Sequence, residues 1–237
     1  MSRVEEISVY PIMDAHDLCR IPDLEMAIWG NRDPVPPSLL KAFVDHGGEV
    51  SVAARRDHPK EWIGFTMSFR GEGTTLYSHQ TGVLPEYQGR GVGRALKRHQ
   101  NQWAYHHQYR AIVWTFDPLR AMNAYFNIAV LGAEVVQYLP NYYGTLTSRL
   151  NQGLPSDRLL VRWAVPAPPV VPTPPPQDAS MTIGIVEDLD ALKAMRPHQA
   201  AAYQDAVRRQ FMKALASGYQ VIGFQRLPHP AYLLKAP

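Results

Sequence analysis

The stretch that decides the fold of this 237-residue chain reads Val83-Leu-Pro-Glu-Tyr-Gln-Gly-Arg-Gly-Val-Gly-Arg94. Residues 74–84 before the turn are rich in β-branched and aromatic side chains, and residues 91–108 after it carry apolar side chains near helical spacing. A glycine-rich turn therefore joins a strand to a helix. Glycine lets a ligand approach the backbone, and the first N–H groups of a helix have no partner within it. Because helix N-termini also favour negative charge, the turn predicts a pyrophosphate site.

Two arginines in this turn support the same prediction. Arg90 and Arg94 can form charge-assisted hydrogen bonds with phosphate oxygens. The spacing differs from the dinucleotide-binding fingerprint, because Leu96 stands where a third glycine is required. Glycine turns before helices are common, so the turn alone does not identify its ligand.

The order of elements around the turn predicts a mixed α/β domain over residues 1–165. A first strand precedes a helix with Asp14 as its N-cap, a proline-rich loop, and a second helix that ends at Gly47. Three antiparallel strands, the motif helix, a strand, a helix and two last strands follow. The strands are expected at 3–12, 49–56, 61–69, 74–84, 111–116, 133–139 and 158–165.

The C-terminal part of the chain predicts an extension behind a linker. Residues 166–177 are the linker, since seven prolines between 166 and 176 favour an extended polyproline II segment. Residues 178–237 then predict a strand, a helical stretch that Pro197 breaks, and a second strand. An apolar stripe on the helix needs a partner surface, so we expect the extension to dock on the main domain or on another subunit. The stripe consists of Tyr203, Val207, Phe211 and Leu215.

Composition excludes several classes of protein. Hydrophobic residues make up 46% and charged residues 19%, which is typical of a globular chain rather than a disordered one. The net charge is only +3 and the arginines are scattered, which argues against a nucleic-acid-binding module. The single cysteine, Cys19, forms no intrachain disulfide, and no leader or membrane-spanning run is visible, so we expect a soluble cytoplasmic protein. No His/Cys/Asp cluster has metal-ligand spacing, so no metal is expected.

The turn resembles a known family motif. Gln88-Gly-Arg-Gly-Val-Gly93 matches the Q/R-x-x-G-x-G/A motif of the GNAT acetyltransferases, and the element order over residues 1–165 is similar to theirs. Leu76-Tyr-Ser-His79, Trp114-Thr-Phe-Asp-Pro-Leu119 and Asn141-Tyr-Tyr-Gly144 also resemble a bacterial group of predicted GNAT acetyltransferases.

The resemblance implies both a fold and a reaction. The fold is an α/β fold with a mixed, mostly antiparallel central sheet flanked by helices, here followed by the strand-helix-strand extension. The reaction is N-acyl transfer from acetyl-CoA or another short acyl-CoA to an amine of a small-molecule or peptide acceptor, by direct attack on the thioester. No metal takes part, and a homo-oligomer is compatible with the resemblance.

The resemblance also assigns the coenzyme site. The backbone of residues 89–94 is expected to hold the pyrophosphate. The N–H groups after Val83, chiefly that of Leu84, are expected to hold the thioester carbonyl as an oxyanion hole. The full coenzyme set is Val83, Leu84, Gln88, Gly89, Arg90, Gly91, Val92, Gly93, Arg94 and Asn123.

The acid and the base are less clearly marked. The family commonly places a tyrosine four residues before the glycine that is Gly132 here, but Ile128 occupies that slot. Tyr125, one turn earlier, is the candidate acid, with a core tyrosine as the alternative. His79 lies four residues before Val83, on the same face of a regular strand, and is the candidate base or proton relay. The alternative for His79 is a core histidine with satisfied hydrogen bonds.

Substrate binding is expected from two regions. Asp117 and Arg120 follow the strand that should border the cleft, although Asp117 can instead cap the next helix. Asn123 and Asn127 share a face of that helix. The long connection 139–158 is expected to approach the acceptor, and its residues suggest a polar or carboxylate-bearing acceptor. The alternative is a mobile surface loop without a functional role. Its candidate residues are Tyr142, Tyr143 and Arg158.

Two other functions compete with acyl transfer. A non-catalytic acyl-CoA-binding protein of the same fold would keep the turn and lack the usual tyrosine. A nucleic-acid-binding module would need one contiguous basic face.

Overall fold

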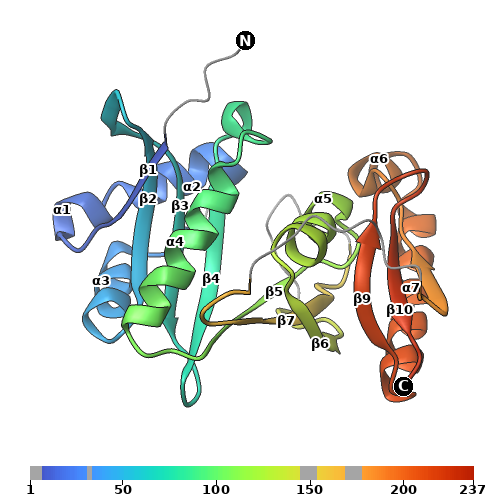
Figure 1. Ribbon diagram of the computed structural model, residues 1–237. Helices are drawn as coiled ribbons and strands as arrows, with labels where there is room; N and C mark the ends of the chain where they lie inside the picture. Colours follow the sequence, from blue (N-terminus) through green and yellow to red (C-terminus); the bar gives the residue numbers. More distant parts are fainter. Residues whose placement is uncertain (1–6, 31–33, 145–153, 169–177) are drawn as a thin grey trace, which may run out of the picture. The chain divides into compact units, whose positions relative to one another are not determined.

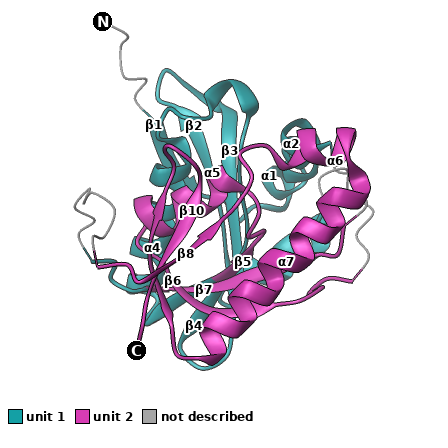
Figure 2. Cartoon of the chain, turned by 90° about the vertical axis from the view of Figure 1, so that its right-hand side faces the viewer, with its two compact units in different colours: residues 1–113, 164–168 teal, residues 114–163, 169–237 magenta. Residues whose placement is uncertain are grey.

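The computed structural model describes residues 7–30, 34–144, 154–168 and 178–237. Contacts divide the chain into two compact units, shown in different colours in Figure 2. Unit 1 comprises residues 1–113 and 164–168, and unit 2 comprises residues 114–163 and 169–237. This division does not coincide with the boundaries 1–165, 166–177 and 178–237, which stay a prediction.

Unit 1 is built on antiparallel strands that follow one another in sequence (Figure 1). They are β1 (Ile7–Pro11), β2 (Glu49–Arg55), β3 (His58–Arg70) and β4 (Thr75–Val83). β5 (Ala111–Phe116) starts beside β4 and runs parallel to it, pairing Thr75 with Ala111 and Tyr77 with Val113. The helices are α1 (Ala15–Leu18), α2 (Ile21–Trp29), α3 (Pro37–Asp45) and α4 (Val92–His106).

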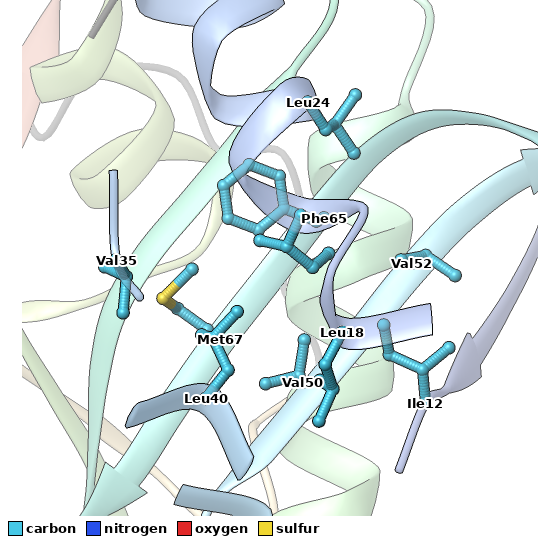
Figure 3. Close-up of a cluster of buried hydrophobic side chains, with 10 residues drawn as sticks. Ile12, Leu18, Leu24, Val35, Leu40, Val50, Val52, Phe65 and Met67 are labelled. Carbon is cyan, nitrogen blue, oxygen red and sulfur yellow. The ribbon is translucent and has the colours of Figure 1, made fainter. Parts of the chain in front are cut away.

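Apolar side chains hold α1–α3 against one face of this sheet. Leu18, Leu24 and Leu40 from the helices meet Phe65 and Met67 of β3 in one buried cluster (Figure 3). Burial contributes about 1.5–3 kcal/mol per large apolar side chain, so the cluster is enough to fix these short helices. α4 covers the opposite face, where Leu96 lies 3.3 Å from the position that a Cβ on Gly64 would take.

The N-terminal helical region differs in detail from the expectation. Asp14 is a helix N-cap, as predicted, and accepts a hydrogen bond from the His16 N–H at 2.8 Å. The single expected helix is divided, because α1 ends at Leu18 and α2 begins at Ile21, with Pro22 in its first turn.

Unit 2 contains the rest of the large sheet. β6 (Glu134–Leu139) and β7 (Arg158–Ala164) are antiparallel neighbours, and the strand order of the sheet is β1-β2-β3-β4-β5-β7-β6. Between β5 and β6 lie a short helix, α5 (Ala121–Ala124), and a π-helical stretch, η2 (Tyr125–Val130). The pairs whose register is described are antiparallel except for β4 with β5, which confirms the predicted fold class.

The C-terminal residues of unit 2 form a second sheet with the order β8-β10-β9. The helical stretch ends at Met195 and resumes at Pro197, as the proline predicts. β10, the central strand of this sheet, was not predicted. The elements are β8 (Met181–Gly184), α6 (Leu189–Met195), α7 (Pro197–Ala216), β9 (Gln220–Gln225) and β10 (Ala231–Lys235).

The buried face of α7 differs slightly from the predicted stripe. Val207 and Phe211 are buried, whereas Tyr203 and Leu215 are only partly buried. A spacing of four residues drifts away from a helix face, which repeats every 3.6 residues. The remaining buried positions of the helix are therefore Ala200, Gln204 and Ala214.

Residues 178–237 pack against residues 114–163 inside unit 2. The Phe211 ring stacks on Tyr138 with 5.4 Å between ring centroids, and the Tyr232 hydroxyl donates to the Pro118 carbonyl at 2.7 Å. The guanidinium of Arg208 binds the buried carboxylate of Asp157 through two nitrogens. The extension thus shares its core with the end of the large sheet.

Candidate active site

The glycine turn has the backbone geometry of an anion site. Gly89 and Gly91 have φ angles of 73° and 87°, and nothing lies within 4 Å of the Cβ position at either residue. Gly91 is the N-cap of α4 and provides no side chain to cap it. The first helical hydrogen bond of α4 runs from the Ala95 N–H to the Gly91 carbonyl at 2.9 Å. The N–H groups of the residues just before Ala95 have no partner in the helix and point out of its N-terminal end. The turn can therefore receive an anion such as a pyrophosphate.

Side chains fix this turn on the end of β4. The Gln88 amide donates to the Val83 carbonyl at 3.0 Å. Val92 is buried with Leu96, so it anchors the helix and offers a ligand only its backbone. The Arg90 guanidinium lies 5.5 Å from the centre of the Tyr87 ring, and Arg90 and Gly89 are exposed while Gly93 and Arg94 are partly buried. The structure thus brings the predicted residues 88–94 together.

One edge of β4 loses its neighbour before the turn. The described pairing with β5 ends at Tyr77, while pairing with β3 continues to Val83. The Leu84 N–H donates to the Ile63 carbonyl on the β3 side at 2.9 Å. Because N–H groups alternate between the two edges of a strand, the Val83 N–H faces the edge that β5 has left.

This alternation corrects the expected oxyanion hole. Leu84 was expected to supply the main donor, but its N–H is already bonded to β3. The N–H groups of Thr81 and Val83 point to the other edge, so Val83 is the residue of the predicted set that has the suitable direction.

His79 lies at a bulge in β4. Met67 pairs with Gln80 and Ser68 with Ser78, which leaves His79 as the extra residue. Its ring lies 6.0 Å from that of Phe69, which stacks on Tyr77 and contacts Phe43 of α3. Burial lowers the pKa of His79 below 6.5. A base that is neutral at physiological pH fits these surroundings.

The bulge also corrects the expected direction of His79. Val83 pairs with Gly64 and packs near Leu96 under α4, whereas His79 joins the aromatic side chains on the α3 side. The two residues lie four apart, but the extra residue breaks the strand period of two. His79 and Val83 therefore face opposite sides of the sheet.

A buried lysine behind β4 was not predicted. Lys97 is 3% exposed, and its Nζ donates to the Ser78 Oγ at 3.0 Å and to the Gln100 Oε1 at 2.7 Å. Burial lowers the pKa of Lys97 to about 7, against the opposing effect of the Glu49 carboxylate. Sequence periodicity marked Lys97 as a polar residue between apolar ones, so it gave no sign of burial.

Lys97 makes the stability of the chain depend on pH. The unfolded chain keeps this proton up to about pH 10.5, whereas the folded chain releases it near pH 7, so stability should rise with pH between these values. Glu49 on β2 and His99 on α4, 3.3 Å apart, are the other titratable groups near this position. We expect Lys97→Met to flatten the rise in unfolding free energy between about pH 7 and 9, measured by urea titration. An equally steep rise in the variant would contradict this assignment.

The predicted acid and the residues near it lie in unit 2. Tyr125 begins η2, is partly buried, and has the Arg226 guanidinium 5.1 Å from its ring centre. Asn123 is exposed, whereas Asn127 is buried and accepts from the Trp114 indole N–H at 3.2 Å. The two asparagines thus differ in exposure, and their shared helix face stays a prediction.

Asp117 and Arg120 form structural contacts at the start of α5. The Asp117 carboxylate accepts from the Leu119 N–H at 2.9 Å, and burial raises its pKa above 3.8. It closes the turn ahead of α5, whose N-cap is Arg120. Arg120 binds the Asp190 carboxylate, with an Nη2 to Oδ1 distance of 2.9 Å. The positive charge of Arg120 is thus balanced by the C-terminal extension.

The described part of the long connection is built around two tyrosines. Tyr142 and Tyr143 are exposed, and the Tyr143 hydroxyl lies 3.0 Å from the Thr115 Oγ1. The buried Arg158 places its guanidinium 5.2 Å from the Tyr143 ring centre. Residues 145–153 of this connection lie outside the described residues. The glycine turn and His79 belong to unit 1, and the other candidate residues belong to unit 2.

The described residues contain no group of three or more His, Cys, Asp or Glu side chains that could hold a metal ion. Within the same ranges, no helix has the length and apolar character to cross a membrane.

Comparisons with known proteins agree with the motif and the fold. Residues 16–127 match the family model described as acetyltransferase (GNAT) family. The ribosomal-protein-S18-alanine N-acetyltransferase of Escherichia coli has a TM-score of 0.54 and 15% identity, covering 68% of this chain and 94% of that one. NAA60 of Arabidopsis thaliana, solved with a bisubstrate analogue, has a TM-score of 0.54 and 20% identity, covering 69% and 100%. The yncA protein of Salmonella typhimurium, solved with its cofactor acetyl-CoA, has a TM-score of 0.52 and 18% identity, covering 70% and 98%. No curated protein sequence matches.

Proposed function

Because the chain belongs to the GNAT acetyltransferase superfamily, we propose that it transfers an acetyl group from acetyl-CoA to the amine of a small-molecule or peptide acceptor. The observation that carries this proposal is the sterically open glycine turn at the start of α4, where Gly89 and Gly91 hold a backbone that only glycine adopts readily. The solved yncA protein contains acetyl-CoA, and NAA60 contains a bisubstrate analogue, which supports the two substrates of the proposed reaction.

We assign the binding and proton-transfer steps of the reaction to particular residues. The N–H groups at the start of α4, with Arg90 and Arg94, bind the pyrophosphate and hold the thioester at β4. The Val83 N–H, on the free edge of β4, stabilises the negative charge that develops on the carbonyl oxygen as the amine attacks. His79 accepts the proton of the amine, and Tyr125 donates one to the leaving thiolate.

Asn123 and the candidate acceptor-binding residues are proposed to complete the substrate site. Asn123 is exposed near the candidate acid and would contact the coenzyme. Asp117, Arg120, Tyr142, Tyr143 and Arg158 are proposed to lie toward the acceptor. Tyr142 and Tyr143 offer exposed aromatic surface, whereas Asp117 and Arg120 would act mainly by shaping the start of α5.

A non-catalytic acyl-CoA-binding protein is the second candidate, because Ile128 occupies the usual tyrosine slot and is buried. Incubation with acetyl-CoA and a panel of amines and peptides separates the two functions. The proposed enzyme should release free thiol in proportion to acetylated amine. Tight binding of acetyl-CoA in calorimetry without thiol release for any acceptor would favour the second candidate.

The role of His79 can be tested by substitution. We expect His79→Ala to lower kcat about 100-fold, because loss of a general base typically has at least this effect, with acetyl-CoA affinity nearly unchanged. In the wild type, activity should fall as pH falls through a pKa below 6.5, where His79 gains its proton.

A matched control is His58→Ala, at an exposed histidine in β3, which should leave kcat unchanged. A core role for His79 predicts a different pattern, in which melting temperature and coenzyme affinity fall together. A loss of kcat below about threefold, or an unaltered acidic limb in the variant, would exclude His79 as the base.

A further inference from the structure

A chain of buried polar side chains connects α4 to β4. Gln100 is fully buried, and its amide donates to the Thr66 Oγ1 at 2.9 Å. Thr66 in turn lies 2.8 Å from the Thr81 Oγ1 and 3.2 Å from the Gln80 carbonyl. Together with the bond from Lys97 to Ser78, the helix therefore contacts β4 directly at Ser78 and, through Thr66 of β3, at Gln80 and Thr81.

The residue enclosed by these points is His79. Ser78 precedes it, and Gln80 and Thr81 follow it, so the contacts flank the bulge on both sides. Here β4 has left β5, and only β3 supports its backbone in the described pairing. A bulged strand with one neighbour has few bonds to define its shape, so side-chain contacts at the bulge decide which way His79 and the outer N–H groups point.

The polar composition of this contact is costly for stability. A buried amine needs hydrogen bonds to offset its lost hydration, and an apolar side chain of similar length would fill the same space without this cost. Leu96 and Val92 on the same helix show that apolar side chains do pack here. Directional hydrogen bonds offer one advantage over apolar packing, because they fix the relative register of the groups that they join.

We propose that Lys97 and Gln100 are positioning residues that set the geometry of the bulged segment 78–81 of β4 from the helix that carries the glycine turn. This inference rests on the proposed function for its catalytic consequence. The turn at the start of α4 and the free edge of β4 must be in register for one ligand to reach both. Lys97 joins these two elements directly, and Gln100 joins them through Thr66 of β3.

The first test measures the strand itself, in the absence of any substrate. Lys97→Met keeps an unbranched side chain of nearly the same length and removes the Nζ. In this variant, the backbone amides of residues 78–83 that bond to β3 should exchange with deuterium about tenfold faster. Residues 92–106 of α4 should exchange at the wild-type rate, and the melting temperature should be unchanged or higher. Lys41→Met, at an exposed lysine on α3, is the control and should alter none of these values.

The second test measures catalysis. Lys97→Met should lower kcat about tenfold with the KM for acetyl-CoA within about twofold, because misplaced donors affect the transition state while the turn still binds the coenzyme. Ser78→Ala should have a similar effect, and the double variant should be no slower than either single one, since both changes remove the same hydrogen bond.

The outcomes separate this inference from the proposed function. A wild type that neither binds nor uses acetyl-CoA would refute the proposed function, and the exchange rates would still decide the positioning role. Unchanged exchange at residues 78–83 in Lys97→Met would overturn the inference. A uniform rise in exchange across unit 1 with a lower melting temperature would also overturn it, because it would show a role in overall stability alone.

Discussion

Gly91→Asp is expected to raise the dissociation constant of acetyl-CoA by about 1,000-fold, to beyond practical detection in calorimetry. Two unit charges about 4 Å apart near a protein surface interact by about 4 kcal/mol, which corresponds to this factor. The new carboxylate would stand at the N-cap of α4, where the pyrophosphate must sit. Because the Cβ position at Gly91 is open, the folded structure has room for the side chain.

Two controls separate charge from backbone strain. Gly91→Asn adds a neutral side chain of the same shape at a φ of 87°, and asparagine tolerates this region at least as well as aspartate. It should lose at most about tenfold in affinity, through strain and bulk alone. Gly73→Asp adds the same charge at another exposed glycine with positive φ, in the turn between β3 and β4, and should bind normally. Unchanged affinity in a folded Gly91→Asp protein would refute the proposed coenzyme site.

The glycine turn that we propose as the coenzyme site was predictable as a structure because its residues are local in the sequence. Gln88, Gly89 and Gly91 lie within a few residues of one another, and the strand before them and the helix after them each have a clear period. The geometry of such a turn depends little on distant parts of the chain. Sequence therefore identified the turn, the helix start and the fold class together.

Hydrogen-bond direction in β4 was not predictable in the same way. Whether Leu84 or Val83 faces the free edge depends on the register of β4 against β3, which the sequence of β4 alone does not contain. The bulge at His79 has the same origin, since only the pairing of Ser78 and Gln80 with adjacent residues of β3 reveals it. A site residue on a strand is thus predicted less well than one in a glycine turn.

Buried polar residues were also missed, for a different physical reason. Lys97 and Asp157 read as surface or loop residues, because charged side chains are almost never fully buried unless they are paired. Their partners lie on other elements: Lys97 meets Ser78 of β4, and Asp157 meets Arg208 of α7. Hydrophobic periodicity describes one element at a time and cannot find such pairs.

Asp157 leads to the largest expected effect on stability. Its carboxylate is fully buried and accepts hydrogen bonds from Tyr138 Oη at 2.6 Å and from the Asn141 N–H at 2.9 Å. The Arg208 guanidinium donates two more hydrogen bonds to this carboxylate, from Nε at 2.8 Å and from Nη2 at 2.9 Å, and its positive charge neutralises the carboxylate. Breaking a fully buried ion pair costs about 3–5 kcal/mol. Since Arg208 itself is 24% exposed, we expect about 2–4 kcal/mol for Arg208→Ala.

For a chain of this size, that loss corresponds to a fall in melting temperature of about 5–15 °C in calorimetry. Arg209→Ala, one residue further on, is the matched control. Arg209 is 71% exposed and pairs only with Asp205 among the described contacts, so its loss should cost less than about 0.5 kcal/mol.

A double variant shows whether the unpaired charge is the cause. In Arg208→Met/Asp157→Asn the buried site holds no net charge, and the amide can still accept from Tyr138, so about half of the lost stability should return. If Arg208→Ala melts within about 2 °C of the wild type, solvent must reach Asp157 in place of the guanidinium, and this pair does not hold the extension. If the expected fall is found and the double variant recovers, residues 178–237 stabilise the end of the large sheet through this contact. In that case α7 supports β7, which carries Arg158, and the turn after β6, which carries Tyr143, and the extension is required for a stable acceptor side of the proposed site.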